Sequence, residues 1–305
     1  MPLDWQYNTK KPEYFEDFYD GLCKKSTYQQ LEIIENKDFP LKDVSVNDLY
    51  FETDDRARIH VKYCYPTSGE IKKVILVFHG YHVSSGAWFD KIAYAKLGFA
   101  VLAMDVRGQS GLSTDVNQTA GSTLKGLVIK GVKEGYQNLY YTQIYMDTYR
   151  LANLAKALHP NIPLVSMGES QGGALAAISA ALTPDIELCL IHHPYLVDIE
   201  HAYELGCAYD GIENYFKWED PLGKSYTEFF QTLSYIDLKF FASRIRAELH
   251  LFTGKKDKVS PLECQMSFYH QVTSKKELYL YPEKGHEYLD GAEDIKLKLL
   301  LRSEI

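Results

Sequence analysis

The sequence predicts an α/β fold in which helices cover both faces of a mostly parallel central sheet. Its composition, 46% hydrophobic and 24% charged over 305 residues, is that of a globular chain that can bury a sizeable core. Short, continuously apolar runs recur along the chain, and most are separated by segments long enough for a helix, as in parallel sheets buried on both faces. These runs are Val74–Phe78, Phe99–Met104, Pro163–Met167, Leu188–Ile191, Leu249–Phe252 and Leu278–Tyr281.

An antiparallel hairpin is expected ahead of these parallel strands. Apolar and polar residues alternate over Val44–Phe51 and Ile59–Tyr65, with a turn at Thr53–Asp55 between the two segments. The aromatic stretch Tyr14–Tyr19 predicts a helix, so residues 1–40 are interpreted as an N-terminal helical extension.

Helices are expected on both sides of the run at 163–167. The helically spaced residues Ile144, Thr148, Leu151, Ala155 and Leu158 predict a helix before it, which Pro160 stops. The small residues of Gly172–Ile178 predict a helix after it that approaches the sheet closely.

The interval 194–243 is too long for a simple crossover, so it is interpreted as a helical insertion or cap. We place it over the carboxyl edge of the sheet, where ligands bind in such folds. Internal repeats and flexible linkers are absent from the sequence, and residues 1–305 are therefore predicted to form a single domain.

Charge and cysteine content argue against several classes of protein. Lys and Arg number 33 and Asp and Glu 41, a net charge of −8, which disfavours binding to nucleic acid or an anionic membrane. No apolar run approaches the roughly 20 residues of a membrane span. Five cysteines without paired spacing disfavour a disulfide framework or a zinc site. Because the opening Met1–Trp5 lacks the features of a signal peptide, a cytoplasmic location is expected.

The strongest chemical signal is the motif Gly168-Glu169-Ser170-Gln171-Gly172, between a predicted strand and a predicted helix. This is the context of a nucleophile elbow, a strained turn that lifts a serine hydroxyl above the sheet. The same letters can also mark a tight turn with an inert serine, but the flanking elements favour Ser170 as a nucleophile.

Such a serine needs a histidine base and a carboxylate, which follow it along the chain on loops after later strands. The loop after 249–252 offers Asp257, and the loop after 278–281 offers His286. Asp257 could instead be a solvated carboxylate among lysines, and Asp237 is its main rival. The remaining histidines weighed for this role have less suitable positions before the acid loop, within strands or in helical segments: His60, His192, His193, His201, His250 and His270.

An acyl-transfer site also needs hydrogen-bond donors for the developing oxyanion. The backbone N–H of Gln171, which follows the nucleophile, is one candidate. The other is the backbone N–H of Tyr81, in the loop His79–His82 after the first parallel strand. The alternative for this loop is an ordinary turn.

Three motifs together resemble the acetyl xylan esterase and cephalosporin-C deacetylase family, also called carbohydrate esterase family seven. They are Arg107-Gly108-Gln109, the serine motif at 168–172, and His286-Glu287, and the similarity runs from about Pro12 to near the end. Supporting matches are Phe78–Tyr81, Lys130–Val132, Tyr140-Tyr141, Thr232–Asp237 and the acid loop ending in Pro261.

The resemblance implies an α/β-hydrolase fold and removal of acetyl groups from small acetylated substrates, such as xylo-oligosaccharides and cephalosporin C, without a metal or other cofactor. By motif position, Ser170, Asp257 and His286 form the triad, and Tyr81 and Gln171 form the oxyanion hole. Residues Arg107, Gln109 and Glu287 would shape the site, although hydrogen bonding that stabilises their loop is an equal alternative for the first two. The resemblance also implies a homo-oligomer, a hexamer whose sites face an inner cavity.

The sequence departs from this family in places that bear on the substrate. Position 169 is glutamate where glycine is usual, His82 stands where asparagine is usual, and the loop Val83–Trp88 looks shorter than is typical. A carboxylate at 169 would alter the charge beside the nucleophile if it pointed inward. The mouth of the pocket and the leaving-group preference are therefore expected to differ.

Other functions compete with deacetylation. A general short-chain carboxylesterase or a small-peptide serine aminopeptidase would use the same elbow and triad order, although the chain has no room for the propeller of prolyl-oligopeptidase enzymes. A non-enzymatic binding protein is disfavoured by the complete serine, acid and histidine set. Metal-dependent deacetylation is disfavoured because the sequence lacks an H-E-x-x-H motif.

Overall fold

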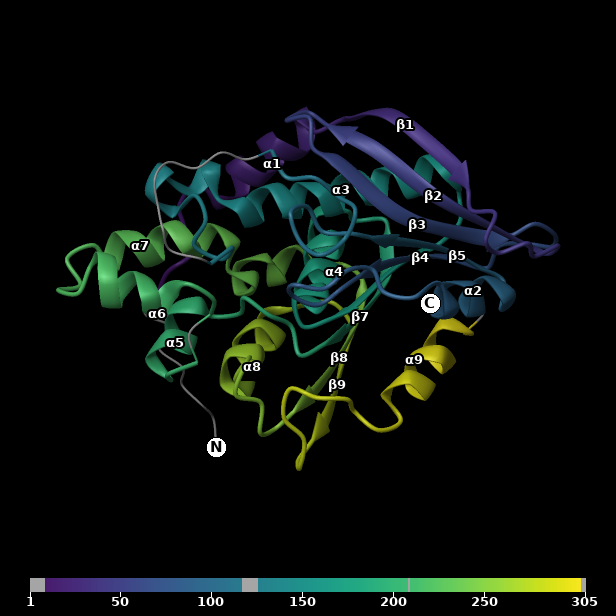
Figure 1. The fold of residues 1–305 in the computed structure, drawn as a ribbon. Helices are drawn as coiled ribbons and strands as arrows, with labels where there is room; N and C mark the ends of the chain where they lie inside the picture. Colours follow the sequence, from purple (N-terminus) through teal and green to yellow (C-terminus); the bar gives the residue numbers. More distant parts are fainter. Residues whose placement is uncertain (1–8, 117–125, 208, 303–305) are drawn as a thin grey trace.

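A computed structural model of the chain describes residues 9–116, 126–207 and 209–302, so the opening Met1–Trp5 lies outside the described residues. Its centre is one nine-stranded sheet in the order β1-β2-β3-β5-β4-β6-β7-β8-β9 (Figure 1). The strands are β1 (Tyr28–Glu35), β2 (Val44–Thr53), β3 (Arg58–Pro66), β4 (Lys73–Phe78), β5 (Phe99–Met104), β6 (Leu164–Glu169), β7 (Ile186–His192), β8 (Glu248–Gly254) and β9 (Lys276–Tyr281).

Strands β4 to β9 all run parallel to one another, which confirms the mostly parallel sheet expected from the apolar runs. Every residue of β5 and of β8 is buried. Burial on both faces explains why these strands are continuous apolar segments rather than alternating ones. Their carboxyl ends meet at one edge of the sheet, where the loops that follow them can be brought together.

The predicted hairpin is confirmed: β2 and β3 pair antiparallel, and β3 continues the sheet by pairing antiparallel with β5. The expectation of an N-terminal helical extension over 1–40 needs correction: among residues 9–40, which the structure describes, α1 (Phe15–Lys25) is the one helix and β1 follows it. All residues of β1 after Tyr28 are exposed. An edge strand exposed on both faces has no need of alternating apolar residues, which is why this segment carries no strand signal.

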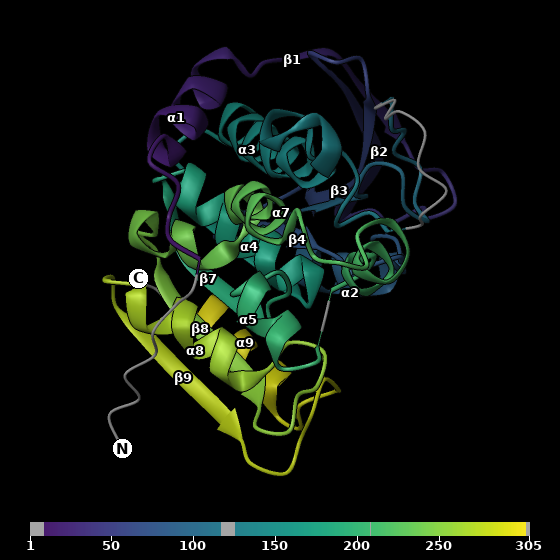
Figure 2. The same ribbon diagram turned by 90° about the vertical axis from the view of Figure 1, so that its left-hand side faces the viewer.

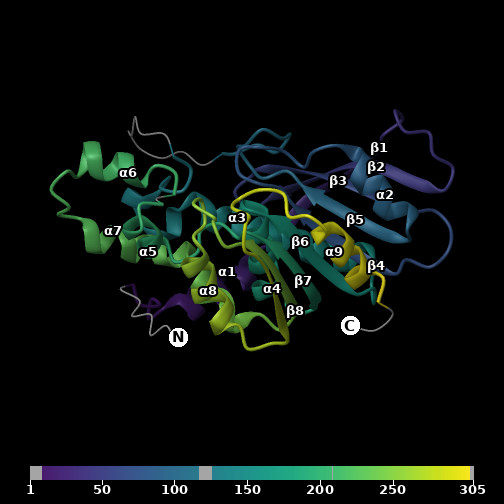
Figure 3. The same ribbon diagram turned by 90° about the horizontal axis from the view of Figure 1, so that it is seen from below.

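Helices cover both faces of the sheet (Figures 1 and 3). On one face, α1, α3 (Tyr140–Leu158), α4 (Gln171–Leu182) and α8 (Leu262–Gln271) share the larger apolar core. On the other face, α2 (Trp88–Lys96) and α9 (Ala292–Leu300) pack over two smaller clusters. Within the described parts of the chain, no helix is both long and apolar enough to cross a membrane.

The helical character expected for 194–243 is present in its described residues, which contain α5 (Ile199–Glu204), α6 (Ile212–Asn214), α7 (Tyr226–Leu233) and shorter helical turns. These helices gather at one end of the molecule (Figures 1 and 3), the end that faces the viewer in Figure 2. Asp237 ties the two ends of this insertion together, since its carboxylate accepts hydrogen bonds from the amides of Asp198 and Ile199, each at 2.8 Å.

Candidate active site

Ser170 occupies a strained turn between β6 and α4, as the motif predicts. Its φ is +56° and its ψ −121°, a conformation that L-residues rarely adopt. The surrounding backbone holds it there, because the Ser170 amide donates to the His192 carbonyl at 2.9 Å and its carbonyl accepts from the Tyr195 amide at 3.1 Å. The turn therefore has the geometry of a nucleophile elbow.

Two glycines of the motif are required by close approach of the backbone. A Cβ at Gly168 would lie 2.3 Å from the carbonyl oxygen of Gly172, and a Cβ at Gly172 would lie 2.0 Å from that of Phe78. Both contacts are with backbone atoms that cannot rotate away. The glycines thus let β6 turn into α4 while packed against the end of β4.

The structure brings the three residues proposed from the sequence into one hydrogen-bonded chain. The Nε2 atom of His286 lies 2.9 Å from the Ser170 Oγ, and its Nδ1 lies 2.8 Å from Asp257 Oδ2. Asp257 stands on the loop after β8, and His286 on the loop after β9. The arrangement can pass a proton from the serine hydroxyl to the imidazole while the carboxylate fixes the ring.

Asp257 is held as a buried carboxylate. Its Oδ1 accepts hydrogen bonds from the amides of Val259 and Ser260, both at 2.8 Å. Burial raises the pKa of Asp257, but interactions with the neighbouring imidazoles of His193 and His286 outweigh that effect, so the pKa lies well below its usual range. The carboxylate therefore stays ionised at neutral pH and can stabilise an imidazolium at His286.

Sequence reasoning set His193 aside as a base and did not anticipate that this fully buried residue lies beside this chain of hydrogen bonds. Its Nδ1 lies 3.4 Å from Asp257 Oδ2, its Nε2 lies 3.0 Å from the carbonyl oxygen of Glu287, and its ring centroid is 4.9 Å from that of His286. Its position before the acid loop along the chain argues against a place in the site. The order of strands in the sheet would have placed it correctly, because β7 lies between β6 and β8 and His193 directly follows β7.

The predicted oxyanion donors stand at the ends of neighbouring strands. Gln171 is the first residue of α4, where an amide has no partner within its own helix. Tyr81 follows β4, which pairs with β6. Within the described structure, neither the Tyr81 amide nor the Gln171 amide donates a hydrogen bond to another protein group. Their role as an oxyanion hole stays a prediction.

The side chains of Gln109 and Gln171 link the loop after β5, the loop after β4 and the first turn of α4. The Gln109 amide group donates to Gln171 Oε1 at 2.8 Å, and its own oxygen accepts from the His82 backbone amide at 3.0 Å. The Tyr141 hydroxyl also donates to Gln171 Oε1 at 2.8 Å. Gln109 thus contacts a predicted site residue through its side chain, consistent with a shaping role.

Arg107 points elsewhere. Its guanidinium is fully buried and donates to Asp147 at 2.6 and 2.8 Å, and to Asp55 at 2.5 Å. These contacts anchor α3 to the turn between β2 and β3, which corresponds to the alternative of a stabilised loop. The side chain of Glu287 is exposed, and only its carbonyl meets the site, through His193.

The residues that depart from the family pattern lie at the rim of the site. Glu169 is exposed, at the end of β6. His82 has a positive φ of +60°, is largely exposed, and its Nε2 lies 4.0 Å from a carboxylate oxygen of Asp210 in the insertion. The Tyr81 hydroxyl donates to the same carboxylate, and burial together with this bond raises the pKa of Tyr81. The insertion therefore contacts the loop that carries Tyr81.

The rival residues have structural partners. Burial raises the pKa of Asp237 to about 6, against the attraction of Lys239, and its carboxylate oxygens accept from backbone amides. His60 lies between Asp48 and Asp105, at 2.8 and 2.7 Å. His250 contacts Glu248 at 2.7 Å. Neither histidine contacts Ser170 in the described structure.

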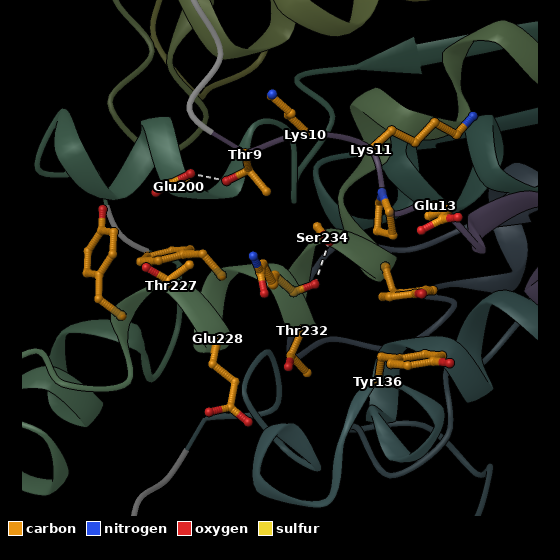
Figure 4. A pocket seen from close by; sticks show the side chains of 15 residues that line it. Thr9, Lys10, Lys11, Glu13, Tyr136, Glu200, Thr227, Glu228, Thr232 and Ser234 are labelled. Atoms are coloured by element: carbon orange, nitrogen blue, oxygen red, sulfur yellow. Dashed lines mark hydrogen bonds between the residues drawn. The ribbon is translucent and has the colours of Figure 1, made fainter.

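A cavity of about 630 Å³ lies away from the candidate active site, and none of the three triad candidates lines it (Figure 4). Its wall combines the segment Thr9–Glu13 with Tyr136 and residues of α5 and α7. Across it the Thr9 hydroxyl donates to Glu200 (Figure 4). This cavity lies between the N-terminal segment and the insertion, and it is not the candidate active site.

Comparisons with known proteins agree with the resemblance drawn from the motifs. The family model for acetyl xylan esterase matches residues 3–302. The chain superposes on acetyl xylan esterase 1 from Thermoanaerobacterium sp. with a TM-score of 0.94, at 33% identity over 100% of this chain and 99% of that one. For an acetyl xylan esterase from Paenibacillus sp. the TM-score is 0.88, at 27% identity over 98% and 99% of the two chains.

Among curated proteins, an acetyl esterase of Xylanibacter ruminicola is 26% identical over 203 residues. The match covers 63% of this chain and 44% of that protein. The chain thus spans less than half the length of this curated relative, whereas it spans nearly all of the two structures above.

Proposed function

This protein belongs to the acetyl xylan esterase family, and on that basis we propose that Ser170, His286 and Asp257 catalyse the deacetylation of small acetylated carbohydrates. Membership makes it a carboxylic ester hydrolase with the α/β-hydrolase fold. One observation carries the assignment of residues: the continuous contact from Ser170 Oγ through both ring nitrogens of His286 to Asp257, at 2.9 and 2.8 Å, on a strained elbow.

The proposed mechanism has two halves. Ser170 Oγ attacks the ester carbonyl as its proton passes to His286 Nε2, and Asp257 stabilises the resulting imidazolium. The amides of Tyr81 and Gln171 would donate to the oxyanion of the tetrahedral intermediate. The intermediate collapses when His286 returns the proton to the leaving alcohol, which leaves an acetyl-serine.

Water completes the reaction. His286 removes a proton from a water molecule as it attacks the acetyl-serine. The second tetrahedral intermediate then releases acetate as His286 returns that proton to Ser170 Oγ. All of these steps use side chains and backbone amides of this chain together with water, so the mechanism as proposed requires no cofactor.

Small acetylated xylo-oligosaccharides are the substrates we propose first, supported by the names of the two structural relatives. Cephalosporin C-like acetyl esters are a second group, by the resemblance described above. The insertion contacts Tyr81 through Asp210, which supports a role for it in limiting the size of the acyl group or of the alcohol.

The test is kcat/KM on p-nitrophenyl esters from acetyl to octanoyl, with acetylated xylo-oligosaccharide, cephalosporin C and aminoacyl anilides run alongside. We expect a steep fall beyond propionyl, no turnover of anilides, and loss of activity in Ser170→Ala. Preference for longer chains would make the protein a general carboxylesterase. Turnover of anilides would make it an aminopeptidase, and wild-type turnover by Ser170→Ala would remove the nucleophile assignment.

We also propose that the protein forms a homo-oligomer, which the family resemblance implies to be a hexamer. Support comes from β1, an edge strand whose Leu31, Ile33 and Ile34 side chains are exposed. Sedimentation velocity at micromolar concentration would overturn this if it found a monomer. A cytoplasmic location is likewise a proposal, supported by five cysteines that are all unpaired.

A further inference from the structure

The buried ring of His193 has one nitrogen without a partner, and it faces the catalytic carboxylate. Its Nδ1 makes no hydrogen bond with any described residue, yet lies 3.4 Å from Asp257 Oδ2. On the other side of this oxygen lies His286 Nδ1, at 2.8 Å. We propose that His193, Asp257 and His286 form a reversible inhibitory site for Zn²⁺, an inference that rests on the function proposed above.

The hydrogen bond at the far side of the His193 ring decides which nitrogen is available. Nε2 lies 3.0 Å from the carbonyl oxygen of Glu287, and a carbonyl can only accept, so Nε2 carries a proton. In the neutral ring Nδ1 then holds a lone pair directed at a carboxylate, two acceptors facing each other. Either a second proton or a metal ion relieves this arrangement.

The spacing fits a tetrahedral ion. With Zn–N and Zn–O bonds of about 2.0–2.1 Å, neighbouring ligand atoms stand roughly 3.4 Å apart. The Nδ1 of His193 and the Oδ2 of Asp257 have that separation already, and all three ligand atoms lie within 4.8 Å of one another. The 2.8 Å contact of His286 with Asp257 must lengthen by about half an ångström, and the two Nδ1 atoms, which lie within 4.8 Å of each other, must come to a similar separation. A partly exposed side chain on a loop, such as His286, can make both movements.

The groups around the ligands are those that support metal binding. A ligating histidine almost always donates its other N–H to a carbonyl or carboxylate, as His193 does to Glu287. The second oxygen of Asp257 is fixed by the amides of Val259 and Ser260. Two imidazole nitrogens and one carboxylate suit Zn²⁺, whereas Mg²⁺ prefers oxygen ligands alone.

Zinc bound here would stop catalysis by changing the tautomer of His286. The ion takes the Nδ1 lone pair, so the proton leaves Nδ1 for solvent and Nε2 gains one from solvent, leaving the ring neutral. A protonated Nε2 has no lone pair to receive the proton of Ser170. At the same time, the charge of Asp257 is directed to the metal instead of to an imidazolium.

The primary experiment measures hydrolysis of p-nitrophenyl acetate by the full chain against buffered free Zn²⁺, each variant normalised to its own rate without metal. We expect inhibition of the wild type that EDTA reverses and Mg²⁺ does not reproduce. His193→Gln keeps a donor for Glu287 but loses the nitrogen at the Nδ1 position, and His193→Phe loses both. Each should raise the inhibition constant at least tenfold.

His192→Phe is the matched control. His192 is the neighbouring buried histidine, and its Nε2 also has no hydrogen-bond partner among the described residues, but it is not part of the three-ligand group. Its inhibition constant should equal that of the wild type. An unchanged constant in both His193 variants, or an equal rise in His192→Phe, would overturn the site.

Calorimetry with Zn²⁺ on Ser170→Ala provides a readout that does not depend on turnover. One site is expected, and it should be lost when His193→Gln is added. If the esterase proposal failed, this binding would still be found. If binding were absent while the wild type hydrolysed acetyl esters, the metal site alone would be wrong.

Discussion

Replacing Asp257 by asparagine should disable the triad through a forced choice of tautomer. Oδ1 of Asp257 accepts from the amides of Val259 and Ser260, so the side-chain oxygen of the introduced asparagine must take that position. The NH₂ group is then left facing His286 Nδ1 at the place of Oδ2. Nδ1 becomes an acceptor, the ring proton moves to Nε2, and the proton of Ser170 has no base to receive it.

The expected loss follows from that geometry. A triad held in the wrong tautomer loses about 10⁴ in kcat, which corresponds to roughly 5.5 kcal/mol of transition-state stabilisation at 1.36 kcal/mol per factor of ten. KM for p-nitrophenyl acetate should change little, because Asp257 is buried behind His286 and meets no substrate.

The assay compares kcat for Asp257→Asn with that of Asp237→Asn, which removes the charge of the rival carboxylate. Asp237 accepts hydrogen bonds from backbone amides of the insertion and has none with His286 in the described structure, so its variant should lose stability to urea and keep kcat within about threefold. A fall of less than tenfold for Asp257→Asn, or a larger fall for Asp237→Asn, would contradict the tautomer argument.

Three further predictions concern the scaffold. Gly172→Ala places a Cβ 2.0 Å from the Phe78 carbonyl oxygen, so we expect about 100-fold lower kcat and a free energy of unfolding lower by about 1–3 kcal/mol. Gly21→Ala, with no atom within 4 Å of the added Cβ, should instead raise the free energy of unfolding by about 0.5–1 kcal/mol. Arg107→Gln leaves Asp147 buried with a weaker set of partners and should lower the free energy of unfolding by about 3 kcal/mol, measured in urea, with KM unchanged. Burial raises the pKa of Asp105, but hydrogen bonds from His60 and backbone amides bring it well below its usual range. The contribution of this carboxylate to stability is therefore full above about pH 4 and is lost as the pH falls further. Asp105→Asn should thus reduce the change in the urea midpoint between pH 5 and pH 3. A slope equal to that of the wild type would show this last expectation to be wrong.

The parts of the fold that were predictable are those with a local sequence signal. Buried parallel strands need apolar side chains on both faces, so β5 and β8 could be recognised from short windows of sequence. Strand β1 could not, because it is exposed after Tyr28 and β2 is the one strand with which it pairs. Its formation depends on a partner that no property of Tyr28–Glu35 reveals.

The same division holds within the site. Arg107 belongs to a motif near the site in sequence, yet its side chain binds Asp55 and Asp147 on another side of the loop. His193 has an unfavourable position along the chain for a triad partner, and it lies against the triad because β7 is placed between β6 and β8.

The elbow at Ser170 and the loops that carry Asp257 and His286 could be identified from sequence alone, because turn strain, glycine contacts and strand-to-loop order are encoded over a few neighbouring residues. Only the tertiary structure decided which side chains face one another. Examples are the 3.4 Å approach of His193 to Asp257 and the contacts of Arg107 with its carboxylate partners. Those contacts join segments that only the order of strands in the sheet brings together. Strand order is set by packing over the whole domain, so no local pattern of residues records it.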